Sequence, residues 1–317
     1  QLIVSAREIN KFHGTFLSSI MKYQVNGRIH GEINQLRGDN GGTVSGRLSM
    51  SNPNLQQVPA RNKDFGPKIR SLFIPEEGYK WGSFDYSQQE PRMTVHYAAS
   101  IGEGYEGSNE LVQAYQNSQA DFHQTVADLV GIERTQAKTI GLGLMYGMGK
   151  QKLAISLGVS KDEANELIIK YNKKVPFVKK LSDRCKYAAD EKGVIRTKKG
   201  RKCRFDMWET RDFGLHVAEK YEDAVAKYGK DNIKRAFTYK ALNRLIQGSS
   251  ADQTKQSMLD CYEDGHLPIL QIHDELCFNV KDEKHAKQIQ KKMQNAIQFK
   301  VPSVVEYGLG ESWGDAK

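Results

Sequence analysis

The spacing of apolar residues predicts helices over much of the chain. Apolar positions recur every three or four residues across residues 3–23, through most of residues 86–184, and again across residues 241–260. A helix is expected to begin near Glu133. The helix before it is expected to carry one apolar face made of Phe122, Val126, Leu129 and Val130.

Shorter stretches with alternating apolar residues predict strands. Residues 79–84 predict a strand that ends at Asp85, and residues 267–280 predict two strands joined by a tight acidic connection at Asp274. Because a helix-rich segment lies between these strand pieces, we expect an α+β architecture. No regular element is predicted for residues 37–59, which are rich in Gly, Ser, Asn and Pro, or for the polar residues 205–240.

Composition excludes several classes of protein. The 317 residues are 38% hydrophobic and 27% charged, which is typical of a globular chain of about two domains. No stretch approaches the roughly 18 consecutive apolar residues that span a bilayer, so a membrane-embedded protein is excluded. The four cysteines form no CxxC pair, and we expect reduced thiols. The chain starts at Gln1 without a secretory pattern, so we expect a piece of a longer protein or a processed product.

The positive charge of the chain is concentrated in one segment. The net charge is +9, yet residues 170–204 alone contain 14 Lys and Arg against 3 Asp and Glu. The rest of the chain therefore has a slight negative excess. Such a local concentration indicates a polyanionic partner. The alternative is a solvated helix face followed by a basic loop.

Two aspartates occupy positions suited to metal binding. Asp85 follows a predicted strand, and Asp274 lies at a predicted hairpin tip. If folding brings them together, their hard oxygen ligands could hold a pair of Mg²⁺ ions about 4 Å apart, as in-line phosphoryl transfer requires. For either residue alone, a role in forming a turn is the simpler interpretation.

The helix predicted after Glu133 carries a chemical stripe on one face. Arg134, Lys138, Leu142 and Tyr146 recur every four residues, while a separate apolar face is formed by Ala137, Ile140, Leu144 and Met148. Two cations followed by an aliphatic residue and a phenol match a triphosphate followed by a sugar and a base. An ordinary amphipathic helix with solvated cations would have the same spacing.

Four blocks, in order, give the chain a family resemblance. They are Thr43–Gln56, Asp85–Arg92, Arg134–Gly147 and Gln271–Glu275. Together they resemble the A-family DNA polymerases, the group of bacterial DNA polymerase I and many phage replicases. The resemblance covers the chain from about residue 40 to its end.

The resemblance implies a right-hand polymerase fold with an antiparallel palm sheet, inserted helical fingers and a mostly absent thumb. It divides the chain into a helical lead-in or thumb remnant (1–30), a first palm part (31–95), fingers (96–236) and a second palm part (237–317). The implied activity is template-directed DNA synthesis from dNTPs on primer-template DNA with two Mg²⁺ ions, in a soluble intracellular enzyme without a membrane. An upstream thumb or exonuclease domain and a processivity factor are further implied partners.

The resemblance also assigns roles to single residues. Asp85 and Asp274 would bind the metals together with the Tyr86 carbonyl, and Lys138 would protonate the leaving pyrophosphate. The residues implied to contact the incoming nucleotide are Gln88, Glu90, His123, Arg134, Lys138, Leu142 and Tyr146, with Glu90 excluding ribonucleotides. The residues implied to line the DNA minor groove, where contacts are nearly independent of sequence, are Arg47, Asn54, Gln56, Asn243, Gln247 and His273.

Departures from the family pattern give further expectations. Leu142 stands where relatives carry Phe or Tyr, so we expect strong discrimination against dideoxynucleotides. Residues 207–231 resemble an insertion of unassigned function. The chain has no exonuclease signature before residue 40 and little room for a thumb, so we expect no proofreading and low processivity.

Two other classes of function fit parts of the sequence. A non-catalytic nucleic-acid-binding remnant would explain the charge equally well, but not Asp85, Asp274, Arg134 and Lys138 together. A two-metal nuclease would use the carboxylates, yet it has no need for the cationic stripe.

Overall fold

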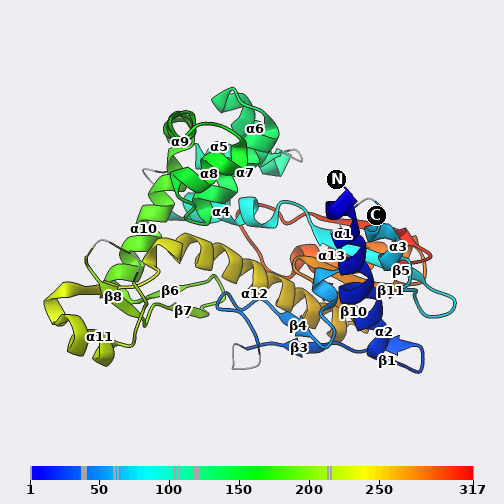
Figure 1. Cartoon of the computed structure of the whole chain (residues 1–317). Coiled ribbons are helices and arrows are strands. Elements are labelled where there is room, and N and C mark those ends of the chain that lie inside the picture. The colour runs from blue at the N-terminus through cyan, green and yellow to red at the C-terminus, as the bar shows by residue number, and fades with distance from the viewer. Residues whose placement is uncertain are drawn as a thin grey trace. The chain divides into compact units, whose positions relative to one another are not determined.

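The computed structural model describes residues 2–36, 41–59, 62, 64–102, 105, 107–117, 121–212, 214 and 216–316, apart from the side chains of residues 2, 4, 5 and 117. Residues 37–40 of the predicted loop and residues 213 and 215 of the predicted insertion lie outside this set. The chain divides into two compact units (Figure 1). Unit 1 comprises Gln1–Ser87, Ala251–Gln298 and Ser303–Lys317, and unit 2 comprises Gln88–Ser250 and Phe299–Pro302.

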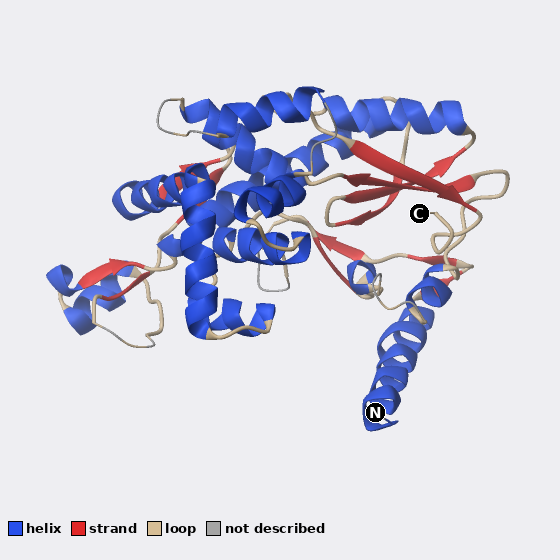
Figure 2. Ribbon diagram, turned by 90° about the horizontal axis from the view of Figure 1, so that it is seen from above, coloured by secondary structure: helices blue, strands red, loops and turns tan. Residues whose placement is uncertain are grey.

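Unit 1 is built on an antiparallel four-stranded sheet, which is seen as red arrows in Figure 2. The strand order is β10-β11-β5-β12. The strands are β5 (Lys80–Tyr86), β10 (Pro268–Ile272), β11 (Glu275–Val280) and β12 (Val305–Gly310). The predicted strands over residues 79–84 and 267–280 are thus confirmed, whereas β12 was not predicted. Hydrogen-bonded partners on both sides fix β5 in the middle of the sheet.

The two faces of this sheet have separate cores, as expected for side chains that alternate along a strand. On one face, Phe84 and Phe278 pack with Ile289 and Met293 of α13 (Glu283–Asn295). On the other face, Trp81 joins a cluster that also contains Phe12, Phe16, Ile20, Ile272, Cys277 and Trp313. Both faces of the sheet are therefore covered, and its strand ends are held rigidly.

The predicted helix over residues 3–23 is confirmed, although its middle is wound as a π-helix. It consists of α1 (Leu2–Lys11), η1 (Phe12–Ser18) and α2 (Ser19–Lys22). Short elements connect it to the sheet: β1 (Gln24–Val25), β2 (Arg28–Ile29), β3 (Glu32–Asn34), β4 (Ser49–Ser51), η2 (Leu55–Gln57) and α3 (Gly66–Arg70).

Unit 2 is mainly helical and has its own hydrophobic core. Its largest fully buried side chains include Tyr171, Phe177 and Ile140. The helices are α4 (Gln89–Ile101), α5 (Ser108–Asn117), α6 (Phe122–Val130), α7 (Arg134–Met145), α8 (Lys150–Leu157), α9 (Lys161–Lys174) and α10 (Pro176–Lys192). The predicted start of a helix near Glu133 is confirmed, because Glu133 is the N-cap of α7.

Two small two-stranded sheets follow α10, in a region where the sequence predicted little. The first pairs β6 (Val194–Arg196) with β7 (Lys202–Arg204), and the second pairs β8 (Trp208–Thr210) with β9 (Ile233–Arg235). Between β8 and β9 lie α11 (Tyr221–Tyr228) and η3 (Lys230–Asn232). After η4 (Thr238–Lys240), the long α12 (Ala241–Glu263) begins in unit 2 and ends in unit 1.

One predicted core residue is wrong. Leu129 is 49% exposed, although Phe122, Val126 and Val130 are buried as expected. The buried face of α6 also includes His123 and Ala127. Successive helical residues are about 100° apart. With these two residues included, the centre of the buried face lies roughly 90° from the direction of Leu129.

The cysteine prediction agrees with the structure, in which Cys185, Cys203, Cys261 and Cys277 are all buried free thiols. No helix in the described part of the chain is long and apolar enough to cross a membrane.

Candidate functional site

The sheet of unit 1 brings Asp85 and Asp274 together. Asp85 lies near the end of β5, and its Cα partner on β11 is Glu275, the residue after Asp274. Asp274 occupies the two-residue turn between β10 and β11, where His273 adopts a positive φ of 56°. The Tyr86 amide donates to the Asp274 carbonyl at 3.4 Å. Two residues remote in sequence thus meet at one edge of a rigid sheet.

This edge carries a local excess of negative charge. Glu275 and Glu306 lie on either side of Asp85 in the sheet register. Partial burial, followed by the like charges of Asp274, Glu275 and Glu306, raises the pKa of Asp85 to about 7. Burial likewise raises the pKa of Asp274, although Arg47 and His273 oppose the shift. A bound cation would relieve this repulsion.

The donor set fits a hard divalent cation. The described residues contain no group of three or more His, Cys, Asp or Glu side chains arranged to hold a metal. The fit therefore rests on the two crowded aspartates, with the Tyr86 carbonyl as an additional oxygen. The Tyr86 side chain is anchored elsewhere: its hydroxyl pairs with Ser257 and donates to the Met293 carbonyl at 2.6 Å. This anchor fixes the backbone beside Asp85.

The DNA-binding residues predicted in unit 1 lie around the same turn. Gln56 donates to the Gln271 side chain at 2.8 Å, and Gln271 in turn donates to the His273 carbonyl at 2.6 Å. Asn54 caps η2 by accepting from the Gln56 amide at 3.1 Å. Arg47 is half-buried, and its positive charge lowers the pKa of Asp274 against the dominant effect of burial. Gln56, Gln271 and His273 thus form a hydrogen-bonded polar network next to Asp274.

In unit 2, α7 has one buried face and a second face that carries the stripe of Arg134, Lys138 and Leu142. Ala137 and Ile140 are almost completely buried, while Arg134 and Lys138 are exposed and Leu142 is half-buried. The helix ends at Met145, and Tyr146 is its C-cap with 38% exposure. At Gly141, an added Cβ would lie 3.2 Å from the Tyr171 hydroxyl. The absence of a side chain at Gly141 thus allows α7 to pack closely against Tyr171.

Hydrogen bonds connect the far end of this stripe to α4. The Tyr146 hydroxyl donates to Glu90 Oε2 at 2.6 Å, so the two residues predicted to face the base and the sugar are in direct contact. Gln88, the N-cap of α4, adopts a positive φ of 52°. Its side-chain oxygen accepts from the Phe122 amide at 2.9 Å, which ties the start of α4 to the start of α6.

The cationic end of the stripe is held by Asp121. Arg134 donates from Nε and Nη2 to Asp121 Oδ2 at 2.9 and 2.6 Å. His123, two residues further along, is only 4% exposed, and its Nδ1 has no hydrogen-bond partner among the described residues. Burial, aided by the charges of Lys138 and Arg134, lowers the pKa of His123 to about 4 against the opposing effect of Asp121. The imidazole is therefore neutral at physiological pH.

The remaining predicted DNA-binding residues lie on the first turns of α12. Asn243 and Gln247 are four residues apart, on one face, and both are half-buried. The basic β6–β7 hairpin is attached beside them. Arg244 Nη1 donates to the Arg204 carbonyl at 2.8 Å, and Arg201 Nη2 donates to the Gly248 carbonyl at 2.7 Å. Both contacts fix the hairpin to this part of α12.

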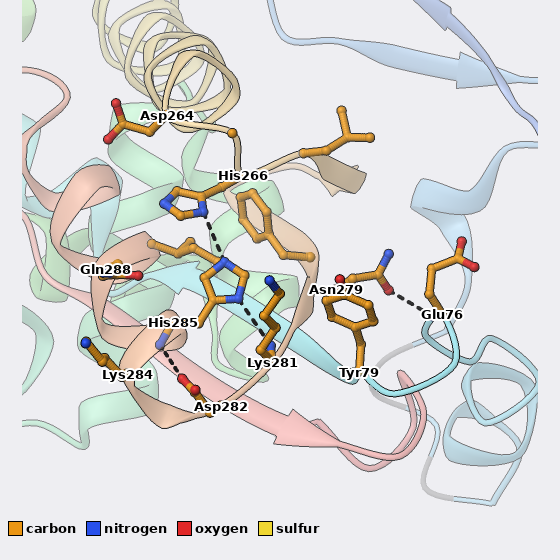
Figure 3. Close-up of a pocket in the computed structure, with 14 residues that line it drawn as sticks. Glu76, Tyr79, Asp264, His266, Asn279, Lys281, Asp282, Lys284, His285 and Gln288 are labelled. Carbon is orange, nitrogen blue, oxygen red and sulfur yellow. Dashed lines mark hydrogen bonds between the residues drawn. The ribbon is translucent and has the colours of Figure 1, made fainter.

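A hollow of about 590 Å³ in unit 1 has none of the predicted site residues in its lining (Figure 3). Its wall includes His266 and His285, whose facing ring nitrogens are 3.0 Å apart. The Lys281 amide donates to His285 Nδ1, so the proton of His285 lies on Nε2, which donates to His266 Nδ1. None of the residues that line this hollow belongs to the four sequence blocks described above.

Sequence reasoning missed two acidic residues that the structure brings to these sites. Glu306 lies opposite Asp85, but β12 itself was not predicted, so nothing in the sequence aligned the two. Asp121 was also missed, although its position directly before the apolar helix Phe122–Val130 is a recognisable N-cap signal.

Comparisons with known proteins define the class of the fold. The structure resembles the polymerase domain of Pol1 from M. smegmatis, described in complex with DNA primer-template and dNTP, with a TM-score of 0.77 and 28% sequence identity. The match covers 98% of this chain and 52% of that chain. The mixed helix and antiparallel-sheet architecture is thus that of a polymerase domain.

The sequence comparisons name the family. The family model described as DNA polymerase family A matches residues 1–315, and the chain belongs to this family. It is 38% identical to the DNA-directed DNA polymerase of Pseudomonas phage M6, over 99% of this chain and 51% of that protein. It is 35% identical to DNA polymerase I of Synechocystis sp., over 99% of this chain and 32% of that protein. The chain spans about half the length of the phage relatives that it matches.

Proposed function

We propose that this chain is the catalytic core of a template-directed DNA polymerase that extends a primer 3′-hydroxyl with dNTPs. The observation that carries the proposal is the meeting of Asp85 and Asp274 at one sheet edge, in a chain of DNA polymerase family A. In this proposal, most of the palm lies in unit 1, and the fingers lie within unit 2. The finer division remains a lead-in over residues 1–30, palm over 31–95 and 237–317, and fingers over 96–236.

Asp85, Asp274 and the Tyr86 carbonyl would hold two Mg²⁺ ions. Such ions, when bound, activate the attacking hydroxyl and neutralise charge that develops on the phosphates. The protein's own part is to keep two carboxylates close despite their repulsion. The middle position of β5 and the tight β10–β11 turn support that role.

The residues of α7 would receive the other end of the nucleotide. Arg134 and Lys138 offer exposed cations to the triphosphate, and neutral His123 offers a hydrogen-bonding ring without adding charge. Lys138 would supply the proton to the departing pyrophosphate. The reaction requires these groups and the two aspartates to act on one bound nucleotide.

Glu90 and Tyr146 would check the sugar and the base. Their 2.6 Å hydrogen bond fixes the Glu90 carboxylate, which supports a rigid barrier against a ribose 2′-hydroxyl. Together with Gln88 and Leu142, they complete the proposed nucleotide contacts.

Primer-template DNA would lie along polar and basic surfaces of both units. The proposed minor-groove contacts are Arg47, Asn54, Gln56, Asn243, Gln247 and His273. The basic hairpin β6–β7 would bind backbone phosphates, which are the main source of affinity for DNA. An upstream domain or a processivity factor would strengthen this grip. We place the reaction inside a bacterial or phage-infected cell.

Primer extension tests the proposal directly. The wild-type chain is expected to extend a labelled primer with dNTPs and Mg²⁺, and Asp274→Ala is expected to abolish extension. Asp264→Ala is a matched control, because Asp264 is an exposed acid of unit 1 that pairs only with Lys292 among the described residues. Loss of extension in both variants, or none in the wild type, would contradict the proposal. Primer shortening without dNTPs would support a nuclease instead.

A further inference from the structure

The two carboxylate oxygens of Asp121, the N-cap of α6, accept hydrogen bonds from different groups. Asp121 Oδ1 accepts from the amides of His123 and Gln124 at 2.8 and 3.1 Å, which caps the helix. Asp121 Oδ2 accepts both hydrogen bonds from Arg134. One side chain therefore fixes the backbone at His123 and the guanidinium of Arg134, two groups assigned above to the incoming nucleotide.

The pairing uses only one edge of the guanidinium. Nε and one hydrogen of Nη2 are engaged, and no other described residue hydrogen bonds to the Arg134 side chain, so the edge that carries Nη1 stays available. The ion pair is partly exposed, with 45% of the Arg134 side chain and 31% of the Asp121 side chain accessible. A phosphate oxygen can thus approach Arg134 without displacing Asp121.

We propose that Asp121 is a positioning residue, which holds Arg134 so that the free edge of its guanidinium meets the triphosphate of the incoming nucleotide. This inference rests on the proposed role of Arg134. An arginine side chain has many rotamers, and ordering it in advance removes part of the entropy cost of binding. Although burial opposes it, hydrogen bonding from Arg134 and from the backbone lowers the pKa of Asp121, so the carboxylate is charged at working pH.

Simple electrostatics predicts the opposite effect, and this makes the idea testable. Asp121 is an anion beside a site for an anion, so a residue that merely competes with the triphosphate would weaken nucleotide binding. Removing its charge would then tighten binding. Positioning predicts that removing the charge weakens binding. The sign of the change separates the two roles.

Asp121→Asn is the informative variant. The asparagine oxygen can keep the helix cap, because Asn and Asp are about equally good N-caps. Its NH₂ group would then face the donors of Arg134 and could not accept from them. The matched control is Asp282→Asn, since Asp282 caps α13 by accepting from the His285 amide at 2.7 Å and forms no ion pair with any described residue.

Equilibrium binding of dATP and of inorganic tripolyphosphate to the 317-residue chain is the readout. Asp121→Asn is expected to raise the Kd of both ligands about two- to tenfold, which is the range for ordering one flexible side chain. Asp282→Asn should leave both values unchanged. In an Arg134→Ala background, Asp121→Asn should cause no further change. Asp121→Ser, which also keeps the cap, should behave like Asp121→Asn.

Unchanged or tighter binding by Asp121→Asn would overturn the inference, as would an equal further loss in the Arg134→Ala background. A lower melting temperature without a change in Kd would reduce the pair to a link between α6 and α7, and would overturn it too. If the wild type fails to extend primers while the Kd pattern holds, the proposed polymerase activity is wrong and the positioning role stands.

Discussion

The carboxylate edge of unit 1 and the α7 stripe of unit 2 carry opposite charges. The first lies on a β-sheet and the second on an α-helix. Asp85 lies on a strand with partners on both sides and is crowded by Asp274, Glu275 and Glu306. Arg134 and Lys138 instead project from an exposed helix face. The acidic group is held by sheet register, whereas the basic group depends on side-chain contacts such as that with Asp121.

The difference shows why each region is incomplete by itself. Crowded carboxylates are relieved by a cation, and clustered exposed cations attract an anion. A metal-bound nucleoside triphosphate supplies both charges. The charge of each region thus suits one part of the ligand that the proposed function requires. The experiments below test whether each region has the role that its charge suggests.

Among variants that keep both aspartates, the largest effect is expected at Lys138. Its ammonium is exposed on α7 and has no ion-pair partner among the described residues, so it is free to meet phosphate. Loss of a general acid costs about 10²- to 10⁴-fold in rate. Lys138→Ala should lower the single-turnover rate of incorporation at saturating dNTP by that factor. Lys138→Arg, which keeps the charge but holds its proton, should restore binding without restoring the rate. Equal rates in all three proteins would rule out proton donation.

The second effect concerns the β6–β7 hairpin, which extends the cationic character of unit 2. Ile195 and Cys203 are buried, so the side chains of Arg196, Lys202 and Arg204 project from the opposite, exposed face. Each phosphate contact contributes about 0.9 to the slope of log affinity against log salt. Changing all three residues to Gln should therefore reduce the slope by about 2–3.

The control for the hairpin removes charge from unit 1. Lys287 and Lys291 lie exposed on α13, outside the proposed DNA surface. Changing both to Gln should leave the salt slope within about one unit of the wild-type value. If the hairpin variant and the control variant reduce the slope of log affinity against log salt equally, the hairpin has no special role in DNA binding.

A smaller effect is expected at Leu142, in the middle of the stripe. Its half-buried aliphatic side chain offers neither a ring nor a hydroxyl to the sugar. The wild type should thus strongly prefer dNTPs over dideoxynucleotides. Leu142→Tyr adds one hydrogen-bonding group, worth about tenfold at most in relative dideoxynucleotide use. Leu142→Phe adds the ring alone and should change the ratio less. Equal use of both substrates by the wild type in competition assays would contradict this expectation.

The contrast between the regions also explains which features were visible in the sequence. The strand before Asp85, the turn at Asp274 and the helix starting at Arg134 follow from local patterns, and the structure contains all three. Local patterns cannot reveal pairings between remote segments. The β12 strand opposite Asp85 and the Asp121–Arg134 ion pair were therefore missed. Leu129 was assigned to the core because spacing alone does not locate the centre of a helix face.

The smallest effect concerns stability and tests the acidic region without any substrate. The folded state raises the pKa of Asp85 from its ordinary value of 3.8 to about 7. Between these pH values the folded chain holds a proton that the unfolded chain releases. Stability from this group is therefore lost as pH rises from about 4 to 7, and above pH 7 the carboxylate repels its neighbours.

Asp85→Asn removes that repulsion. At pH 8 without metal, the variant should be more stable than the wild type by about 1–2 kcal/mol. This value is reduced to allow for solvent screening, because the Asp85 side chain is partly exposed. This corresponds to roughly 2–6 °C in melting temperature, and the difference should vanish near pH 4. Adding Mg²⁺ should stabilise the wild type much more than the variant, because only the wild type keeps both carboxylates. If Mg²⁺ stabilises the two proteins equally, the acidic edge of unit 1 is not the metal site, and the α7 stripe alone would account for nucleotide binding.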